Sequence, residues 1–203
     1  KHMPQLRQPL LSSASAPWTV LLELSDSESE AHARERFEGV LGQALERGII
    51  GDAAIAESVA QSHTMWHLRE SIPLAQAEEG LNIKHDIALP VSRIPAFCAE
   101  AEAALSHAAP GMRLVNFGHL GDGNLHFNVQ APAGMDAPMF LREREHEVNH
   151  IVYAAVAAHG GSISAEHGVG VLKREELVQY KDATALALMR AIKQALDPRG
   201  LMN

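Results

Sequence analysis

Cysteine is almost absent from the sequence. The 203 residues contain a single cysteine, Cys98, so the chain can form no internal disulfide and no zinc site built on cysteines. This composition fits a reducing compartment. Any metal site must be built from histidine, aspartate or glutamate side chains.

Basic clusters and long apolar runs are absent too. The formal net charge is −8, and no group of lysines and arginines could neutralise a row of phosphates, which argues against nucleic acid or anionic membranes as partners. An acidic small molecule is still compatible with the chain if a few basic residues converge. No apolar run approaches the roughly 20 residues that span a bilayer, and the N-terminus lacks the pattern of a signal peptide. We therefore expect a cytoplasmic location and no transmembrane segment.

The two ends of the sequence are irregular. With 46% apolar residues the chain can bury a core, and its length fits one large domain or two small ones. Residues 1–17 are rich in proline and serine, and we assign them to the truncated edge of a domain, with residues 1–3 either native or a cloning remnant. Residues 18–203 are assigned to one domain. Because ALDPRGLMN stops just after a turn, we expect the chain to be a piece of a larger polypeptide.

The spacing of apolar residues alternates between the periods of strands and helices. Short apolar or alternating runs predict strands at residues 18–24, 53–58, 82–90, 113–117 and 125–129. Helical spacing predicts helices at residues 62–79, 92–107 and 138–159, with further helices in the last third.

One more helix is expected near the N-terminus. It should start at a capping box formed by Ser27 and Glu30 and stop at Gly48. Its apolar residues between positions 37 and 45 should form one buried stripe. Further along, Pro73 should kink the helix at 62–79 or start a new one.

This order of elements favours an α+β fold. The strands at 113–117 and 125–129 are too closely connected for a parallel crossover, which needs a dozen or more linking residues. We therefore predict an antiparallel or mixed sheet with helices packed on one face, related to ferredoxin-like layers and followed by C-terminal helices.

Two glycine-rich segments carry most of the chemistry. GHLGDGNLH, residues 118–126, contains His119 and His126, and SAEHGVG, residues 164–170, contains Glu166 and His167. Two imidazoles and a carboxylate suit a zinc, manganese or iron ion with positions left open for substrate. Loops held by a rigid scaffold often carry function, so both segments could form one site.

Plainer structural roles account for several of the same residues. A histidine in a glycine-rich turn often only forms a hydrogen bond there, and Asp122 is most simply a turn former. Ser162 and Ser164 are expected to shape the second turn, because no serine-hydrolase elbow occurs. The glycines stand in the wrong order for a dinucleotide fingerprint, and no P-loop lysine follows them.

The motifs together resemble a known family. GHLGDGNLHFNV, GGSISAEHGVG and ALDPRGLMN are similar to the C-terminal substrate domain of FAD-linked 2-hydroxyacid oxidoreductases, which include D-lactate dehydrogenases, D-2-hydroxyglutarate dehydrogenases and the flavin subunit of glycolate oxidase. PWTVLLELSD, WHLRESIPLA and NIKHDIALPVS also resemble family segments in family order. The resemblance therefore extends over nearly the whole chain.

The resemblance implies roles for particular residues. His119, His126 and Glu166 would bind the divalent metal, and His167 would remove the proton of the substrate hydroxyl. The residues implied in substrate and flavin contacts are Arg69, Lys84 and Asn128 for substrate and Asn203 for flavin. Arginine can grip a carboxylate with two parallel hydrogen bonds, while lysine supplies a point charge.

The implied activity is oxidation of a small D-2-hydroxy acid to the 2-oxo acid by hydride transfer to FAD, with an electron acceptor downstream. Hydroxyglutarate-type members carry a threonine where this chain has Pro73, which puts a second substrate carboxylate in doubt. The FAD-binding domain of the family lies outside this sequence, so we expect the isolated chain to be inactive and to hold FAD poorly.

Other functions stay open at this point. A flavin-independent metal-dependent hydrolase could use a metal-activated water on the same three ligands. A metal-stabilised binding or assembly domain would need no catalysis. The sequence also leaves a homodimer open.

Overall fold

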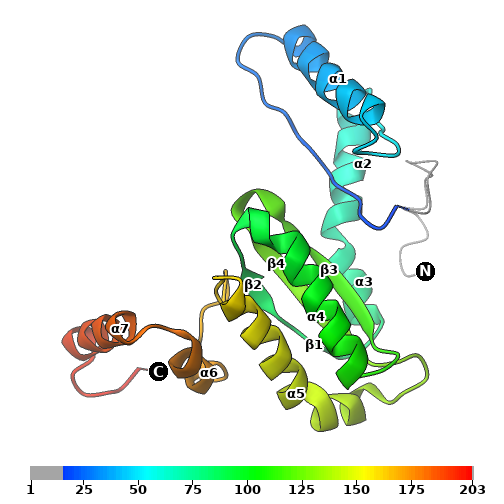
Figure 1. Cartoon of the computed structure of the whole chain (residues 1–203). Helices are drawn as coiled ribbons and strands as arrows, with labels where there is room; N and C mark the ends of the chain where they lie inside the picture. Colours follow the sequence, from blue (N-terminus) through cyan, green and yellow to red (C-terminus); the bar gives the residue numbers. More distant parts are fainter. Residues whose placement is uncertain (1–15, 203) are drawn as a thin grey trace. The chain divides into compact units, whose positions relative to one another are not determined.

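The computed structural model describes residues 16–202. By its internal contacts the chain divides into two units, one ending at Glu79 and the other beginning at Gly80. Figure 1 shows the helices and strands of both units in chain order. Among the described residues, no helix is both long enough and apolar enough to cross a membrane.

The first unit contains three helices, α1 (Glu30–Glu46), α2 (Val59–Glu70) and α3 (Ile72–Glu78). The cap of α1 is Ser29 rather than the expected Ser27, because the Oγ of Ser29 accepts a hydrogen bond from the backbone N–H of His32 at 3.2 Å. Gly48 follows the end of α1 with a φ of 64°, which confirms it as the stop signal.

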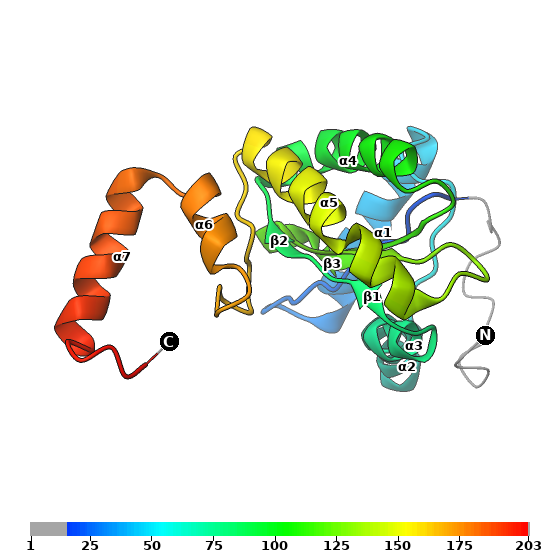
Figure 2. The same ribbon diagram turned by 90° about the horizontal axis from the view of Figure 1, so that it is seen from below.

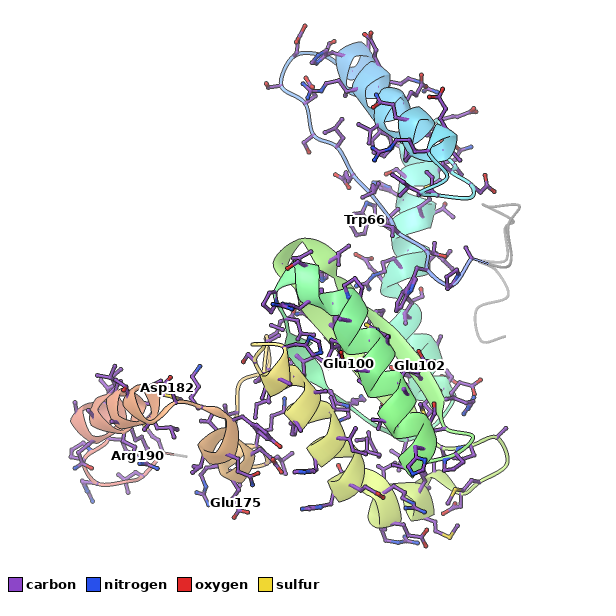
Figure 3. The ribbon with its side chains drawn as sticks, viewed as in Figure 1. Trp66, Glu100, Glu102, Glu175, Asp182 and Arg190 are labelled. Atoms are coloured by element: carbon purple, nitrogen blue, oxygen red, sulfur yellow. The ribbon has the colours of Figure 1, made fainter. Side chains whose placement is uncertain are left out.

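Pro73 separates α2 from α3, as the sequence indicates. Proline stands in the first turn of α3, where it removes no helical hydrogen bond. The Oγ of Ser71 donates to the carbonyl oxygen of His67 at 2.6 Å, and one helix ends and the next begins at Ser71. Trp66, labelled in Figure 3, donates from Nε1 to Oε2 of Glu23 at 2.7 Å and so ties α2 to the segment before α1.

Two expected strands and one expected buried stripe are absent from this unit. Residues 18–24 and 53–58 form no strand, and Trp18 and Val20 are 58% and 61% exposed. Extended backbone becomes a strand only when a neighbour accepts and donates its hydrogen bonds, and within residues 16–79 no neighbour does. No residue of α1 is buried, and its Val40 is 63% exposed.

The second unit is built on one antiparallel sheet. Its strands are β1 (Asn82–Ile83), β2 (Asp86–Ala88), β3 (Arg113–His119) and β4 (Asn124–Gln130). β4 is central, with β3 on one side and β1 and β2 in line on the other. This arrangement confirms the predicted α+β class and selects the antiparallel form of the sheet.

Two long helices cover one face of this sheet. They are α4 (Ile94–Ala108), which follows a 3₁₀ turn at Val91–Arg93, and α5 (Ala137–Ala158), and Figure 2 shows both on the same side of the strands. The resulting β-α-β-β-α order is ferredoxin-like. At the end of α5, Nε2 of His159 lies 2.9 Å from Oε2 of Glu100 on α4, which is labelled in Figure 3.

The core lies between the sheet and these helices. Fully buried side chains come from α4, α5 and alternate positions of the strands, namely Phe97, Ala101, Leu105, Val148, Val152, Val156, Ile87, Phe127 and Val129. The rings of Phe97 and Phe127 meet edge to face with centroids 5.1 Å apart. Alternation along β4 therefore assigns one face of the sheet to the core.

A histidine is part of this core. His85 is fully buried, with Nδ1 2.7 Å from the carbonyl oxygen of Phe127 and Nε2 2.9 Å from Oδ1 of Asn149. A neutral imidazole has one N–H, so Nδ1 donates to Phe127, and Nε2 accepts from Asn149 once its amide is turned over. Burial is the main reason that the pKa of His85 falls to about 4.

The last third contains α6 (Arg174–Tyr180) and α7 (Ala183–Leu196). Asp182, labelled in Figure 3, caps α7 by accepting a hydrogen bond from the N–H of Ala185 at 2.9 Å. The final turn is held by Asp197, whose carboxylate accepts from the N–H groups of Leu201 and Met202 at 2.8 Å each. The side chain of Lys193 also donates to Asp197 and lowers its pKa to about 2.

Candidate metal and substrate site

The face of the sheet opposite α4 and α5 carries polar side chains. Directly paired residues of antiparallel strands point to the same face, and every second residue follows them. Asp86 pairs with His126, and His119 pairs with Asn124, so all four share this open face. The sheet therefore gathers residues from three strands on one surface.

The substrate residues implied by the resemblance extend this surface. β1 and β2 keep one register along β4, which sets Lys84 opposite Asn128 on the same face. Lys84 is exposed, whereas Asn128 is only 5% exposed. The Oδ1 of Asn128 accepts a hydrogen bond from the backbone N–H of His85 at 3.2 Å.

The first glycine-rich loop joins β3 to β4 through a 3₁₀ turn at Leu120–Asp122. Oδ1 of Asp122 accepts from the N–H of Asn124 at 3.1 Å, which confirms Asp122 as a turn former. Gly123 has a φ of 77°, and a Cβ there would lie 2.0 Å from the carbonyl oxygen of Leu89. The loop therefore needs glycine both for its backbone conformation and for close packing.

The second glycine-rich loop and the residues just before it lie along the edge of β2 that does not pair with β4. Ser162 forms an antiparallel bridge with Ala88 through N–O distances of 3.0 and 2.8 Å. Its Oγ donates to the carbonyl oxygen of Ser164, and the Oγ of Ser164 donates to that of Gly168. Both serines thus shape the turn, as predicted, and this loop is fastened to the sheet.

Asp86 connects this loop to β2. Its Oδ2 accepts hydrogen bonds from the backbone N–H groups of Glu166 and His167, each at 2.9 Å. Its own carbonyl oxygen accepts from the N–H of Ala165 at 3.2 Å. One buried residue therefore binds three consecutive amides of the loop.

Asp86, His126 and Glu166 form a group that could hold a metal ion. Each contributes one potential ligand atom, and these atoms all lie within 4.8 Å of one another. The side chain of Asn124 donates to Oε1 of Glu166 and orients that carboxylate. Two carboxylates and an imidazole suit a divalent cation.

A buried oxygen supports the fit to a cation. Asp86 is 4% exposed, and within residues 16–202 its Oδ1 accepts no hydrogen bond. A carboxylate oxygen buried without a partner is costly. A cation bound by this oxygen would satisfy it.

The electrostatics of Asp86 agree with an ionised carboxylate. Burial acts to raise its pKa, but hydrogen bonds from the amides of His167 and Glu166 and the charges of His167 and His126 lower it below the ordinary value. Nδ1 of His167 lies 3.7 Å from Oδ2 of Asp86. The Nζ of Lys173 donates to the carbonyl oxygen of Ile163 at 2.9 Å. Burial lowers the pKa of Lys173, and the negative charge of Asp86 acts in the opposite direction.

The group differs from the predicted ligand set in one member. His126 and Glu166 belong to it, whereas His119, exposed at the end of β3, lies outside it in the described chain. Sequence reasoning missed Asp86, although alternation in NIKHD puts Asp86 on the same face as Lys84. The ligand role of His119 stays a prediction.

The other predicted site residues lie as follows. The side chain of His167 is 68% exposed, and its ring centroid is 6.1 Å from that of His126. Arg69 belongs to α2 of the first unit, and its substrate role stays a prediction. Asn203 lies outside the described residues.

Comparison with protein families assigns the class. A model of the family "FAD linked oxidases, C-terminal domain" matches residues 5–203, so the chain belongs to this family. The resemblance drawn from its motifs is thereby confirmed.

Individual relatives have more specific names. The chain is 36% identical over its whole length to the mitochondrial D-2-hydroxyglutarate dehydrogenase of Arabidopsis thaliana. It is 39% identical to D-2-hydroxyglutarate dehydrogenase of Xanthomonas citri pv. viticola over 92% of the chain, and 38% identical to the mitochondrial enzyme of Rattus norvegicus over 93%. The matches cover 34%, 39% and 34% of those proteins, so the chain spans little more than a third of their length.

Proposed function

We propose that this chain is the substrate- and metal-binding domain of a flavin-dependent oxidoreductase that oxidises a D-2-hydroxy acid to the 2-oxo acid. The observation that carries the proposal is the convergence of Asp86, His126 and Glu166 beside His167 on the face of the sheet that α4 and α5 leave open. Membership of the FAD-linked oxidase family supports the redox class.

The substrate proposed first is D-2-hydroxyglutarate, because the relatives carry that name. Lys84 supplies positive charge for the carboxylate shared by all 2-hydroxy acids. The substrate role of Arg69 rests on the family resemblance alone. Pro73 has no hydroxyl with which to bind a second carboxylate. A shorter acid such as D-lactate is therefore the second substrate to try.

Each residue of the candidate site has a role in this proposal. A bound FAD supplies the hydride acceptor, and a bound zinc, manganese or iron ion supplies a Lewis acid. His126 and Glu166 hold the cation, with Asp86 or His119 as a further ligand. His167 accepts the hydroxyl proton as the general base, and Asn128 lines the substrate pocket.

The test uses an enzyme that contains this chain together with an FAD-binding domain. A panel of D- and L-2-hydroxy acids is assayed with a dye as electron acceptor. We expect dye reduction with D acids only, and a His167→Ala variant that keeps its metal but loses at least about a hundredfold in turnover. No reduction with any 2-hydroxy acid, together with metal-dependent ester hydrolysis, would favour a hydrolase instead.

The isolated chain provides the matched comparison. We expect the purified 203-residue chain to bind FAD weakly and to reduce no dye. Flavin absorbance near one equivalent after gel filtration would contradict this expectation. The same column measures whether the chain is the homodimer that the sequence leaves open, and cell fractionation tests the proposed cytoplasmic location.

A further inference from the structure

The two carboxylate oxygens of Asp86 have different surroundings. The side chain projects from β2, is only 4% exposed, and lies opposite His126 in the strand register. Oδ2 accepts two hydrogen bonds from backbone N–H groups, and Oδ1 accepts none within residues 16–202. The two oxygens can therefore serve two purposes at once.

Oδ2 holds the second glycine-rich loop. It accepts the N–H groups of two successive residues, Glu166 and His167, at 2.9 Å each. Residues 163–168 have no helix or strand, so these contacts fix the backbone at the point where the ligand and the proposed base emerge. Hydrogen bonds to a charged acceptor are about twice as strong as neutral ones.

Oδ1 lies on the other side of the same carboxylate. It is buried without a hydrogen-bond partner in the described chain. Asp86 also belongs, with His126 and Glu166, to the group whose ligand atoms lie within 4.8 Å of one another. Its remaining lone pairs are therefore available to a cation in that group.

We propose that Asp86 binds a divalent cation through Oδ1, together with His126 and Glu166, and positions Glu166 and His167 through Oδ2. The catalytic meaning of this arrangement rests on the proposed function, but cation binding and loop anchoring do not. Asp86 is thus a ligand and a positioning residue in one side chain, and it couples occupancy of the cation site to the conformation of the loop.

The experiment uses the 203-residue chain and Zn²⁺ or Mn²⁺ as probe. Calorimetric titration measures affinity, and the backbone amide resonances of Glu166 and His167 report the anchor. Asp86→Asn keeps an oxygen that can accept both amides but loses the charge. We expect it to bind the cation at least tenfold more weakly, with both amide resonances near their original positions.

Asp86→Ala should remove both functions. Its cation affinity should fall as far as that of Asp86→Asn, and the amide resonances of Glu166 and His167 should move upfield and exchange faster with solvent. Asp122→Asn is the matched control, because Asp122 caps a turn in the neighbouring loop and should leave affinity unchanged. Resonances of α4 and α5 show whether each variant is folded.

Two results would overturn the proposal. If both Asp86 variants bind the cation as tightly as the original chain, or the original chain binds neither ion, Oδ1 is not a ligand. If Asp86→Ala is folded and the amides of Glu166 and His167 are unmoved, Oδ2 is not an anchor. Since no flavin is present, failure here is distinct from failure of the dye assay.

Discussion

Acid should destabilise the second unit through His85. Burial lowers the pKa of this imidazole to about 4, although its hydrogen bond to the carbonyl oxygen of Phe127 acts in the opposite direction. In the unfolded chain the same group returns to its ordinary value of 6.5. Between these pH values the unfolded chain binds a proton that the folded chain excludes.

The sign and size of the effect follow from proton linkage. Above pH 6.5, His85 is neutral in both states and adds no pH dependence. As the pH falls, the unfolded state gains the proton first, so the free energy of unfolding drops by up to about 1.4 kcal/mol per pH unit. Over the whole window down to about pH 4, the loss amounts to about 3 kcal/mol. Below that pH both states are protonated and the effect levels off.

Urea unfolding from about pH 7 to about pH 4 measures this loss. Removing the titrating group with His85→Gln should flatten the pH dependence by about 3 kcal/mol relative to the original chain. His146→Gln is the control, because His146 is exposed on α5 and meets water in both states. If the free energy of unfolding fell equally with pH in the original chain and in His85→Gln, the reasoning would be refuted.

Three further substitutions, one of them with a matched control, test other parts of the second unit. Gly123→Ala should destabilise it by more than about 2 kcal/mol in urea unfolding, because a Cβ would lie 2.0 Å from a carbonyl oxygen. Gly121→Ala, with open space around it, should change little. Phe97→Ala should cost about 3–5 kcal/mol in the same assay, since the ring is fully buried in the core. Asp197→Asn should speed hydrogen exchange of the Leu201 amide by weakening its acceptor; unchanged exchange would show that the turn does not need the charge.

Local patterns predicted the helices and strands of the second unit well. Alternation across residues 82–90 predicted one strand with a solvated face, which the structure divides into β1 (Asn82–Ile83) and β2 (Asp86–Ala88). Helical spacing at 138–159 predicted α5 (Ala137–Ala158). Pro73 was expected to kink or restart a helix, and it stands at the start of α3. These features depend on neighbours in the sequence, which a pattern can reveal.

The first unit shows what such patterns cannot provide. Residues 18–24 have the apolar composition of a strand, but a strand also needs another segment to complete its hydrogen bonds. Nothing within the run identifies that segment. The same limit applies to α1, whose apolar stripe predicts a buried face without specifying what covers it.

The sequence predicted which types of residue form the candidate site, but only two of the three residues that the structure brings together. His126 and Glu166 stood out because imidazole and carboxylate side chains in glycine-rich loops are potential metal ligands. Asp86 did not, because its importance comes from contact with Glu166, 80 residues away in the sequence. His119 drew attention through its motif, yet it lies outside the group within 4.8 Å.

Three glycines in or next to the two loops have a specific physical explanation. A Cβ at Gly118, Gly123 or Gly161 would lie only 2.1, 2.0 or 2.4 Å from a backbone carbonyl oxygen of a neighbouring segment. Real side chains do not tolerate such contacts, so these positions bring three stretches of main chain closer together than any other residue permits. The distance between Asp86 and the loop that carries Glu166 depends on this packing. Segments that look flexible in the sequence are therefore closely packed against neighbouring main chain at these three positions.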